Sequence, residues 1–320
     1  MYFYLIGTDY KIAAAGIKAG LYRLRPKIAD FWKNKEAALL FTCNRIEIYA
    51  VSKNPDIAFS NIAKFSQCFP DFFRHTYIKY GEKEVFKHAL RLASGLESQL
   101  QGELQIFYQL YNWHTQEKLP YFLGTLWKEA LALARVIRIQ SSLDKDKDNI
   151  AEVVYFDLIN RLKLSREIDI VIVGTGKIAQ LLARSHKPGQ RLNFVAHKNY
   201  QKAKELAMIS RGRAFLIKDL AQVLPKADVL ISATTSPHYV LKSKDFINLS
   251  RSLYIYDLAL PADVEPAVKK LPGVYLLNLE DLTEVIQLFN QRNQEKIRLA
   301  NRLAEEAIEE CLEAGYVKNN

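Results

Sequence analysis

Long hydrophobic runs are missing from this sequence. A membrane-spanning helix needs roughly 18–20 consecutive apolar residues, whereas the longest apolar runs, such as Ile168–Val173, are short enough to be buried strands. The N-terminus, MYFYLIGTDYKIAAAG, lacks the basic segment and small-residue cleavage site of a secretory signal peptide. We therefore expect no membrane span and no secretion, and we interpret the N-terminus as a first strand.

Cysteine is also scarce. The three cysteines, Cys43, Cys68 and Cys311, are an odd number and show no Cys-x-x-Cys spacing. A disulfide framework and a structural zinc site are therefore poor fits, so we expect no metal and a reducing, cytoplasmic location. Each cysteine is then either a small buried hydrophobic residue or a reactive thiol.

The length and the charge point to two domains and a polyanionic partner. A chain of 320 residues is too long for one typical core. The net charge of +10 is uneven: residues 280–320 hold five basic and nine acidic side chains, a net charge of −4, so the rest carries +14. A net charge this positive on residues 1–279 favours polyanionic partners such as RNA, because basic side chains attract phosphates.

The first part of the chain mixes short strands with helices. Three runs are strand-like: Met1–Gly7, Ala37–Phe41 and Arg45–Val51. Between residues 85 and 114 apolar side chains recur every three or four positions, which predicts one long amphipathic helix or two in tandem. Gly95 and Gly102 interrupt this pattern and indicate a turn or a close backbone approach.

The second part alternates strands with helices. The polar, charged run of residues 141–149 is the best domain boundary, and six strand-like runs follow it: 169–174, 192–196, 213–217, 228–234, 253–259 and 274–278. Helical stretches lie between most of them, which predicts an α/β fold with a doubly wound parallel sheet. A single long helix is expected from Glu280 to about Gly315. We expect a catalytic, substrate-binding domain over 1–148, a Rossmann domain over 149–279 and a C-terminal helix over 280–320.

A dinucleotide-binding turn follows the first strand of the second domain. Two glycines in the pattern G-x-G-x-x-A let the chain turn sharply and approach a pyrophosphate, and the N-terminus of the next helix offers free N–H groups. The candidate cofactor residues in this turn are Gly174, Thr175, Gly176, Lys177, Ile178 and Ala179.

The cofactor is expected to be NADPH. An NAD site usually places an acidic residue at the end of the second strand, but here that strand ends in His197 and Lys198. A basic side chain there suits a 2′-phosphate. Ser232 and Thr234 follow the fourth strand and are expected to line the nicotinamide side, whereas His238, next to a proline in a loop, is interpreted as structural.

Cys43 is the best candidate nucleophile. It lies between two strand-like runs, and Arg45 supplies a cation that favours the thiolate. Cys68 and Cys311 lack such neighbours. A thiol beside an NADPH domain suggests attack on an activated acyl group, a thioester, and its reduction to an aldehyde. Together with the basic charge, this favours an aminoacyl ester as the acyl donor.

At the level of motifs, the sequence closely resembles the glutamyl-tRNA reductase family. The resemblance runs nearly end to end and is carried by six segments: TCNRIEIY (42–49), HALRLASGLES with GELQI (88–98 and 102–106), VIVGTGKIA (171–179), SATTSPHYVL (232–241), DLALPADVEP (257–266) and LLNLEDL (276–282). The first two are quite specific to the family, whereas the cofactor turn is generic.

The resemblance implies the first step of five-carbon tetrapyrrole synthesis. Cys43 would attack the ester of glutamyl-tRNA(Glu), and NADPH would reduce the resulting thioester to glutamate-1-semialdehyde. Arg45 would bind the substrate carboxylate by a bidentate pair, and His88 would act as an acid, a base or a positioning group. The other substrate-binding candidates are Thr42, Asn44, Glu47, Ser94, Glu103 and Gln105.

The chain also departs from the family pattern. The opening motif reads Asp9–Ala14, Leu104 replaces a usual proline, Ala262 replaces a usual arginine, and residues 141–149 replace a threonine-rich run. We expect the family's C-terminal dimerisation domain to be absent or truncated, which leaves a homodimer open. The resemblance alone suggests the semialdehyde aminomutase as a partner.

Two other functions stay open from the sequence. One is a thiol-dependent acyl or aldehyde dehydrogenase that acts on a small substrate. The other is a catalytically impaired relative that binds tRNA or a protein of the pathway. The basic charge disfavours the first, and the presence of Cys43, Arg45 and His88 disfavours the second.

Overall fold

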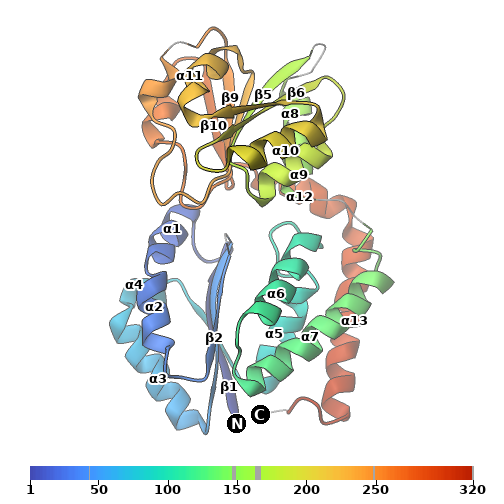
Figure 1. Ribbon diagram of the computed structural model, residues 1–320. Coiled ribbons are helices and arrows are strands. Elements are labelled where there is room, and N and C mark those ends of the chain that lie inside the picture. Colours follow the sequence, from blue (N-terminus) through green and yellow to red (C-terminus); the bar gives the residue numbers. More distant parts are fainter. Residues whose placement is uncertain (43, 146–148, 163–166, 248, 319–320) are drawn as a thin grey trace. The chain divides into compact units, whose positions relative to one another are not determined.

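The computed structural model describes residues 1–42, 44–145, 149–162, 167–247 and 249–318 (Figure 1). The chain divides into two compact units, and each is described by itself. Unit 1 comprises Met1–Asp148 and Leu288–Asn320, and unit 2 comprises Asn149–Gln287. Among the described residues, no helix is long and apolar enough to cross a membrane.

Unit 1 contains a four-stranded antiparallel sheet in the order β2-β3-β1-β4. Its strands are β1 (Tyr2–Asp9), β2 (Ala37–Phe41), β3 (Arg45–Ser52) and β4 (Tyr77–Tyr80). Alternating side chains of β1 enter two different cores, as the period of two in a strand requires. Phe3 and Leu5 pack on one face, and Tyr4 and Ile6 on the other. The three strands expected from the sequence are confirmed, whereas β4 was not expected.

Four helices cover the face that carries Tyr4 and Ile6 (Figure 1). They are α1 (Ala15–Arg23), α2 (Arg25–Trp32), α3 (Pro55–Cys68) and α4 (Pro70–Phe73). Trp32 and Phe65 fill this core at 2% and 0% exposure. The Asn54 side chain caps α3 by accepting from the Ile57 N–H at 3.0 Å, so the chain turns into this helix at a fixed residue.

The helices on the other face are α5 (Glu82–Ala93), α6 (Leu104–Gln116), α7 (Tyr121–Gln140) and α13 (Gln294–Glu313). The expectation of two helices in tandem is therefore confirmed. Gly95 and Gly102 lie in the turn between α5 and α6 with φ of +82° and +80°. Only glycine adopts such angles without strain, which explains why the helical pattern stops there.

The single C-terminal helix expected from Glu280 to Gly315 is wrong in detail. The segment forms α12 (Thr283–Arg292) and α13, separated at Asn293. Asn290 of α12 forms two hydrogen bonds with the turn between α5 and α6. Its Oδ1 accepts from the Gln101 N–H and its Nδ2 donates to the Gln99 carbonyl, both at 2.9 Å. Asparagine is also a poor helix former, so a break at residue 293 costs little.

Unit 2 contains a six-stranded parallel sheet in the order β10-β9-β8-β5-β6-β7, which confirms the doubly wound fold. The strands are β5 (Ile168–Val173), β6 (Gln190–Ala196), β7 (Arg213–Leu216), β8 (Val229–Ser232), β9 (Leu253–Asp257) and β10 (Val274–Asn278). Strand order reverses between β5 and β8. Sheets of this type bind ligands at the carboxyl ends of the strands beside that reversal.

Helices lie on both faces of this sheet. They are α8 (Ile150–Leu162), α9 (Lys177–Ser185), α10 (Tyr200–Ser210) and α11 (Leu220–Val223), and the short 3₁₀ turns are η1 (Ile217–Asp219), η2 (Leu224–Lys226), η3 (Ser243–Phe246) and η4 (Pro266–Lys270). The central strand β5 is buried on both sides, with Ile170, Val171 and Ile172 at 0% exposure. A continuous apolar strand is typical of a parallel sheet covered on both faces.

Candidate active site

A buried carboxylate organises the polar interior of unit 1. Arg45, Glu47 and Tyr49 alternate along β3, so their side chains share one face of the sheet. Four side chains contact the Glu47 carboxylate: Arg45 Nη1 donates to Oε1 at 2.6 Å, Tyr77 donates to Oε1 at 2.5 Å, His88 Nε2 lies 2.9 Å from Oε1, and Tyr49 donates to Oε2 at 2.7 Å. We call these five residues the Glu47 cluster.

The charges of this cluster depend on each other. Burial alone would raise the pKa of Glu47, but the charges of Arg45 and His88 and the hydrogen bonds that it accepts hold this pKa well below its usual range. Burial would lower the pKa of Arg45, and the charge of Glu47 raises it instead. The two ions therefore stabilise each other inside the protein, and removing either would leave the other buried and unpaired.

The residues on either side of the candidate nucleophile form a tight turn between β2 and β3. The Thr42 hydroxyl accepts from the backbone N–H groups of Asn44 at 3.3 Å and Arg45 at 3.2 Å, and the Thr42 N–H donates to the Arg45 carbonyl at 2.9 Å. Cys43 itself lies outside the described residues. The structure thus fixes the strands and the turn residues that flank it.

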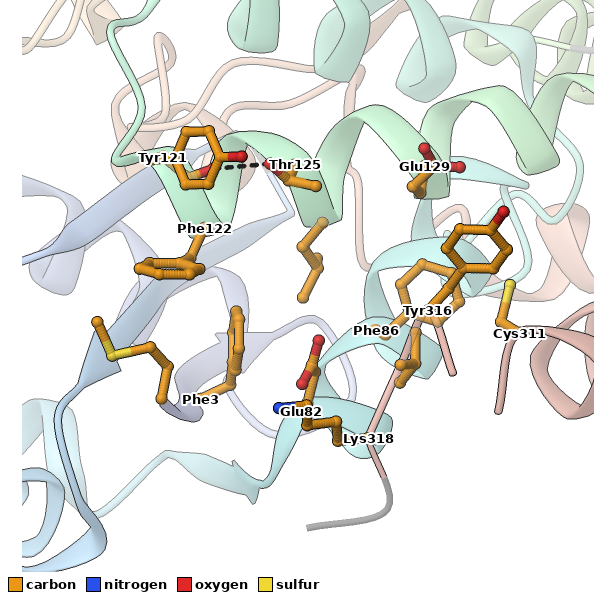
Figure 2. A pocket seen from close by; sticks show the side chains of 13 residues that line it. Phe3, Glu82, Phe86, Tyr121, Phe122, Thr125, Glu129, Cys311, Tyr316 and Lys318 are labelled. Atoms are coloured by element: carbon orange, nitrogen blue, oxygen red, sulfur yellow. Dashed lines mark hydrogen bonds between the residues drawn. The ribbon is translucent and has the colours of Figure 1, made fainter. Parts of the chain in front are cut away.

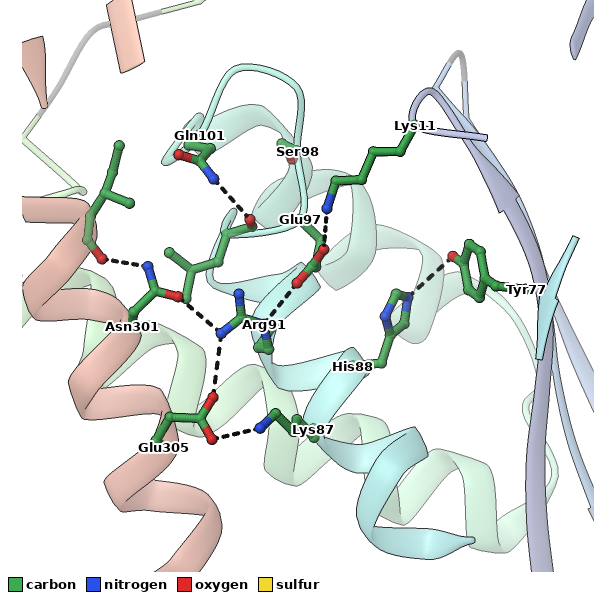
Figure 3. Close-up of polar contacts among 12 residues, drawn as sticks. Lys11, Tyr77, Lys87, His88, Arg91, Glu97, Ser98, Gln101, Asn301 and Glu305 are labelled. Carbon is green, nitrogen blue, oxygen red and sulfur yellow. Dashed lines mark hydrogen bonds and ion pairs between the residues drawn. The ribbon is translucent and has the colours of Figure 1, made fainter. Parts of the chain in front are cut away.

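The turn between α5 and α6 meets the Glu47 cluster through Arg45. Arg45 Nη2 donates to the Glu97 carbonyl at 2.6 Å, and the Glu97 carboxylate accepts from Lys11 at 2.8 Å and from Arg91 at 2.7 Å (Figure 3). Burial would raise the pKa of Glu97, but the hydrogen bonds and charges of Lys11 and Arg91 lower it to about 2. Both terminal nitrogens of Arg45 are therefore engaged, and the side chain is 2% exposed.

The substrate-binding candidates of this turn lie in different surroundings. Ser94 is buried, Gln105 lies in the first turn of α6, and Glu103 precedes that helix. Burial of the Glu103 carboxyl raises its pKa to about 7, although a hydrogen bond with Ser98 opposes the shift. Glu103 is thus a group that changes its charge near neutral pH.

Sequence reasoning did not single out Arg138, which holds this turn together. The buried guanidinium donates to four backbone carbonyls: Ser94 at 2.9 Å, Gly102 at 2.8 Å, Glu103 at 3.3 Å and Leu143 at 3.3 Å. A Cβ at Gly95 would lie 2.9 Å from Arg138 Nη1. The two glycines that interrupt the helical pattern indicated a close contact in this turn. They could not show that Arg138 makes it.

A pocket opens on unit 1 beside the Glu47 cluster. It has a volume of about 270 Å³ and is lined by residues that include Asp9, Lys11, Tyr77, His88, Arg91 and Glu97. Figure 3 shows that Lys11, His88 and Arg91 gather around Glu97 in this region. The pocket brings the His88 imidazole together with the cationic side chains of Lys11 and Arg91 and with the carboxylates of Asp9 and Glu97.

Another pocket of unit 1, of about 310 Å³, is lined in part by Cys311 (Figure 2). Aromatic side chains that include Phe86, Tyr121 and Tyr316 line it. Burial, with the nearby carboxylates of Glu129 and Glu310, raises the pKa of the Cys311 thiol. A raised pKa disfavours the thiolate, so Cys311 is a poor nucleophile.

In the expected cofactor turn between β5 and α9, the backbone adopts a conformation that only glycine takes up without strain at Gly174. Gly174 has a φ of +113°, and a Cβ there would lie 2.8 Å from the Ala233 carbonyl oxygen. Gly176 precedes α9, and a Cβ there would meet only that same oxygen, at 3.9 Å, so the space above the turn is open. Ala179 is buried against the sheet at 0% exposure. A pyrophosphate therefore fits at the start of α9.

The remaining cofactor candidates divide into two groups. His197 and Lys198 are exposed just after β6. Ser232 and Thr234 instead donate hydrogen bonds to the buried Asp263 carboxylate, at 2.7 Å and 2.5 Å. These two hydroxyls therefore hold the loop after β8 in place.

Asp257 and Asp263 shape this loop and were not among the expected site residues. The Asp257 carboxylate accepts from the N–H groups of Ala259, Asp263 and Val264 at 3.2, 3.3 and 2.9 Å. Burial raises the pKa of Asp257 to about 6, although these hydrogen bonds oppose the shift. Both acids lie in the segment 257–266. In the sequence this segment indicated a resemblance to the family, but none of its residues was expected in the site.

Two family models match this chain. The model described as "Glutamyl-tRNAGlu reductase, N-terminal domain" matches residues 9–141, and the model described as "Shikimate / quinate 5-dehydrogenase" matches residues 159–285. The first match covers the Glu47 cluster and the turn between α5 and α6. The second covers the six-stranded sheet.

Several curated proteins are similar over most of the chain. A glutamyl-tRNA reductase of Methanococcoides burtonii is 31% identical over 291 residues, which are 87% of this chain and 66% of that protein. One from Thermus thermophilus is 29% identical over 326 residues, which are 97% of this chain and 80% of that protein. The chain spans less than two thirds of some relatives, for example 62% of the one from Methanosarcina mazei. A solved glutamyl-tRNA reductase of Methanopyrus kandleri is 25% identical over 98% of this chain and 80% of its own, with a TM-score of 0.48.

Proposed function

We propose that this chain, which belongs to the glutamyl-tRNA reductase family, reduces glutamyl-tRNA(Glu) to glutamate-1-semialdehyde with NADPH. The observation that carries the proposal is the Glu47 cluster, which holds Arg45 and His88 on one buried carboxylate next to the turn that contains Cys43. This arrangement lies in the part of the chain that matches the family's N-terminal domain.

The first half of the reaction uses residues of unit 1. The Cys43 thiolate attacks the carbonyl carbon of the glutamyl ester, a carbon–sulfur bond forms, and the bond to the ribose oxygen breaks. The ribose hydroxyl of the tRNA leaves with a proton, which His88 would supply. Arg45, two residues from Cys43, adds positive charge that favours the thiolate.

The second half needs a hydride. Bound NADPH would supply it to the thioester carbonyl, so that the aldehyde leaves and the Cys43 thiolate is restored. The turn of Gly174 and Gly176 would hold the pyrophosphate, and Lys198 would pair with the 2′-phosphate. The open space above Gly176 and the positive φ of Gly174 support this assignment.

The glutamyl group fits the pocket of about 270 Å³ beside His88. Sequence reasoning assigned its carboxylate to Arg45, but that guanidinium already donates to Glu47 and to the Glu97 carbonyl. Lys11 is 51% exposed at its side chain and Arg91 is 22% exposed. These two cations can turn from Glu97 to a substrate carboxylate, and we propose them as its partners. A homodimer, a partnership with the semialdehyde aminomutase and a cytoplasmic location stay predictions.

Coenzyme preference and product together test this proposal. Purified protein is incubated with glutamyl-tRNA(Glu) and either NADPH or NADH, and the aldehyde is measured by chromatography. We expect NADPH to support the faster reaction and Lys198→Glu to weaken that preference, whereas Lys202→Glu, four residues further on in α10, leaves it unchanged. Equal rates with both coenzymes would contradict the NADPH assignment. The absence of aldehyde with either would contradict the function.

A further inference from the structure

The charge of unit 1 is concentrated in one pair of helices. Residues 1–148 hold twenty-one basic and fifteen acidic side chains, a net charge of +6. The segment 18–35, which forms most of α1 and all of α2, holds six basic residues and the single acid Asp30, a net charge of +5. The rest of that part of the chain is therefore almost neutral, so any attraction of unit 1 to a polyanion centres on these helices.

Four of these cations are exposed and uncompensated. Arg23, Arg25, Lys27 and Lys33 are exposed, and within the part of the chain that the structure describes none of them forms an ion pair. Lys87 and Arg91 on α5, by contrast, both pair with Glu305. We call the four residues the α1–α2 basic surface. Unpaired cations at a surface are available to an external anion at no cost in broken ion pairs.

This surface adjoins the strand that leads to the nucleophile. The guanidinium of Arg25 lies over the Phe41 ring at 4.9 Å, and the Tyr22 ring meets Phe41 edge-on at 6.3 Å. Phe41 ends β2, and Thr42 and Cys43 follow it directly. The α1–α2 basic surface therefore begins at the residue that introduces the catalytic turn.

The outer side of α1 also lacks bulk. A Cβ at Gly16 or at Gly20 would meet no atom within 4 Å, so internal packing does not require glycine at either position. A glycine inside a helix is less stabilising than an alanine, because its backbone loses more conformational freedom. Small residues on an exposed helix let a partner's backbone come close to the cations beside them.

We infer that the α1–α2 basic surface binds the phosphates at the acylated 3′ end of the substrate tRNA; this inference rests on the proposed function. The ester that Cys43 attacks is on the terminal ribose, so the nearest phosphates must lie beside the catalytic turn. That end of a tRNA is single-stranded, and a positively charged surface that follows its backbone needs no base-specific contact. Charge, position and the smooth helix face all fit this partner.

The test compares two triple variants of equal charge. Arg23→Gln, Lys27→Gln and Lys33→Gln together remove three charges from the α1–α2 basic surface. Lys53→Gln, Lys64→Gln and Arg74→Gln remove three charges from elsewhere on unit 1. The dissociation constant of tRNA(Glu) and the KM for glutamyl-tRNA are measured at several salt concentrations. Reduction of 2′(3′)-O-glutamyl-adenosine, which has the same ester and no phosphate, is measured in parallel.

The two variants should separate clearly. We expect the first to weaken tRNA binding about tenfold and to make its dependence on log salt shallower by about 2, with little change on the phosphate-free ester. The second should change binding less than about twofold. Equal losses in both variants, or no loss in the first, would overturn the inference. If the wild type binds tRNA through this surface but reduces neither substrate, the proposed function fails and the binding surface stands.

Discussion

A single carboxylate, that of Glu47, sets the positions of four other side chains. It is 0% exposed and faces Arg45, His88 and two tyrosines. A buried charge is tolerated only when its partners replace the water that it has lost. We therefore expect Glu47 to be a positioning residue: it holds His88 and Arg45 beside the turn between β2 and β3, and its own carboxylate is fully buried.

Glu47→Gln should be strongly destabilising. The amide cannot balance the buried charge of Arg45, and breaking a buried pair costs about 3–5 kcal/mol. Tyr49→Phe, which removes one hydrogen bond to the same carboxylate, should cost about 1 kcal/mol. Urea unfolding at pH 7 measures both. Equal stability of Glu47→Gln and the wild type would contradict the importance of this pair.

The same residue predicts the response to acid. Because the pKa of Glu47 is lowered in the folded state, its contribution to stability is present above its ordinary value of 4.5 and is lost as the pH falls further. Wild-type unfolding should therefore become easier as the pH falls below that value. Glu47→Gln should lack this part of the pH dependence.

Glu103 predicts the opposite dependence. Burial raises its pKa from 4.5 to about 7, so its contribution is fully present below the lower value and is lost as the pH rises through about 7. Glu103→Gln keeps the neutral shape, and at pH 8 it should be more stable than the wild type by about 1–2 kcal/mol. At pH 5 the two should be nearly equal. If Glu103→Gln were less stable than the wild type at both pH values, burial would not be disfavouring the ionised form of Glu103.

At the level of elements, Gly174 and Gly176 of the proposed cofactor turn are expected to have different roles. Gly174 needs its positive φ, and a Cβ there would lie 2.8 Å from a backbone carbonyl. Gly174→Ala should therefore destabilise unit 2. Gly176 has open space, so Gly176→Ala should leave stability unchanged within about 0.5 kcal/mol and weaken NADPH binding, because the methyl group occupies the place of a phosphate.

Thermal unfolding and fluorescence titration with NADPH distinguish the two. If Gly176→Ala bound NADPH as the wild type does, the turn would not be the pyrophosphate site. If Gly174→Ala were as stable as the wild type, the close approach to Ala233 would not constrain the backbone.

The elements of unit 2 were easier to predict than those of unit 1. Strands such as β5 and β8 consist largely of apolar residues and are buried on both faces of the sheet, so they are readily recognised in the sequence. The single C-terminal helix was wrong because the break at Asn293 accompanies a contact of Asn290 with a turn far away in sequence. Local periodicity contains no information about such a partner.

The candidate site was likewise predictable from the sequence only in part. Arg45, Glu47 and His88 were each expected at the site in separate roles, and the structure joins these three side chains directly. Their roles depend on contacts that span long stretches of chain, such as the bond from Arg45 to the Glu97 carbonyl. Arg138 was missed for the same reason, since its four carbonyl partners come from two turns brought together only by folding.

At the scale of the whole molecule, charge is distributed unevenly along the sequence. Residues 149–279 carry nineteen basic and eleven acidic side chains, a net charge of +8, and residues 280–320 carry −4. The segment with the proposed cofactor turn and the segment with the proposed nucleophile are the basic ones. The acidic C-terminal segment contributes Glu305, which pairs with Lys87 and Arg91 of α5.

The proposed reaction requires Cys43 to carry the glutamyl group. This role can be tested by a single turnover with labelled glutamyl-tRNA(Glu) and excess protein, quenched in acid, with and without NADPH, for the wild type and Cys43→Ser. We predict label on the wild-type protein without NADPH, its conversion to glutamate-1-semialdehyde when NADPH is added, and neither in the variant. Aldehyde formed by Cys43→Ser at the wild-type rate would contradict the claim.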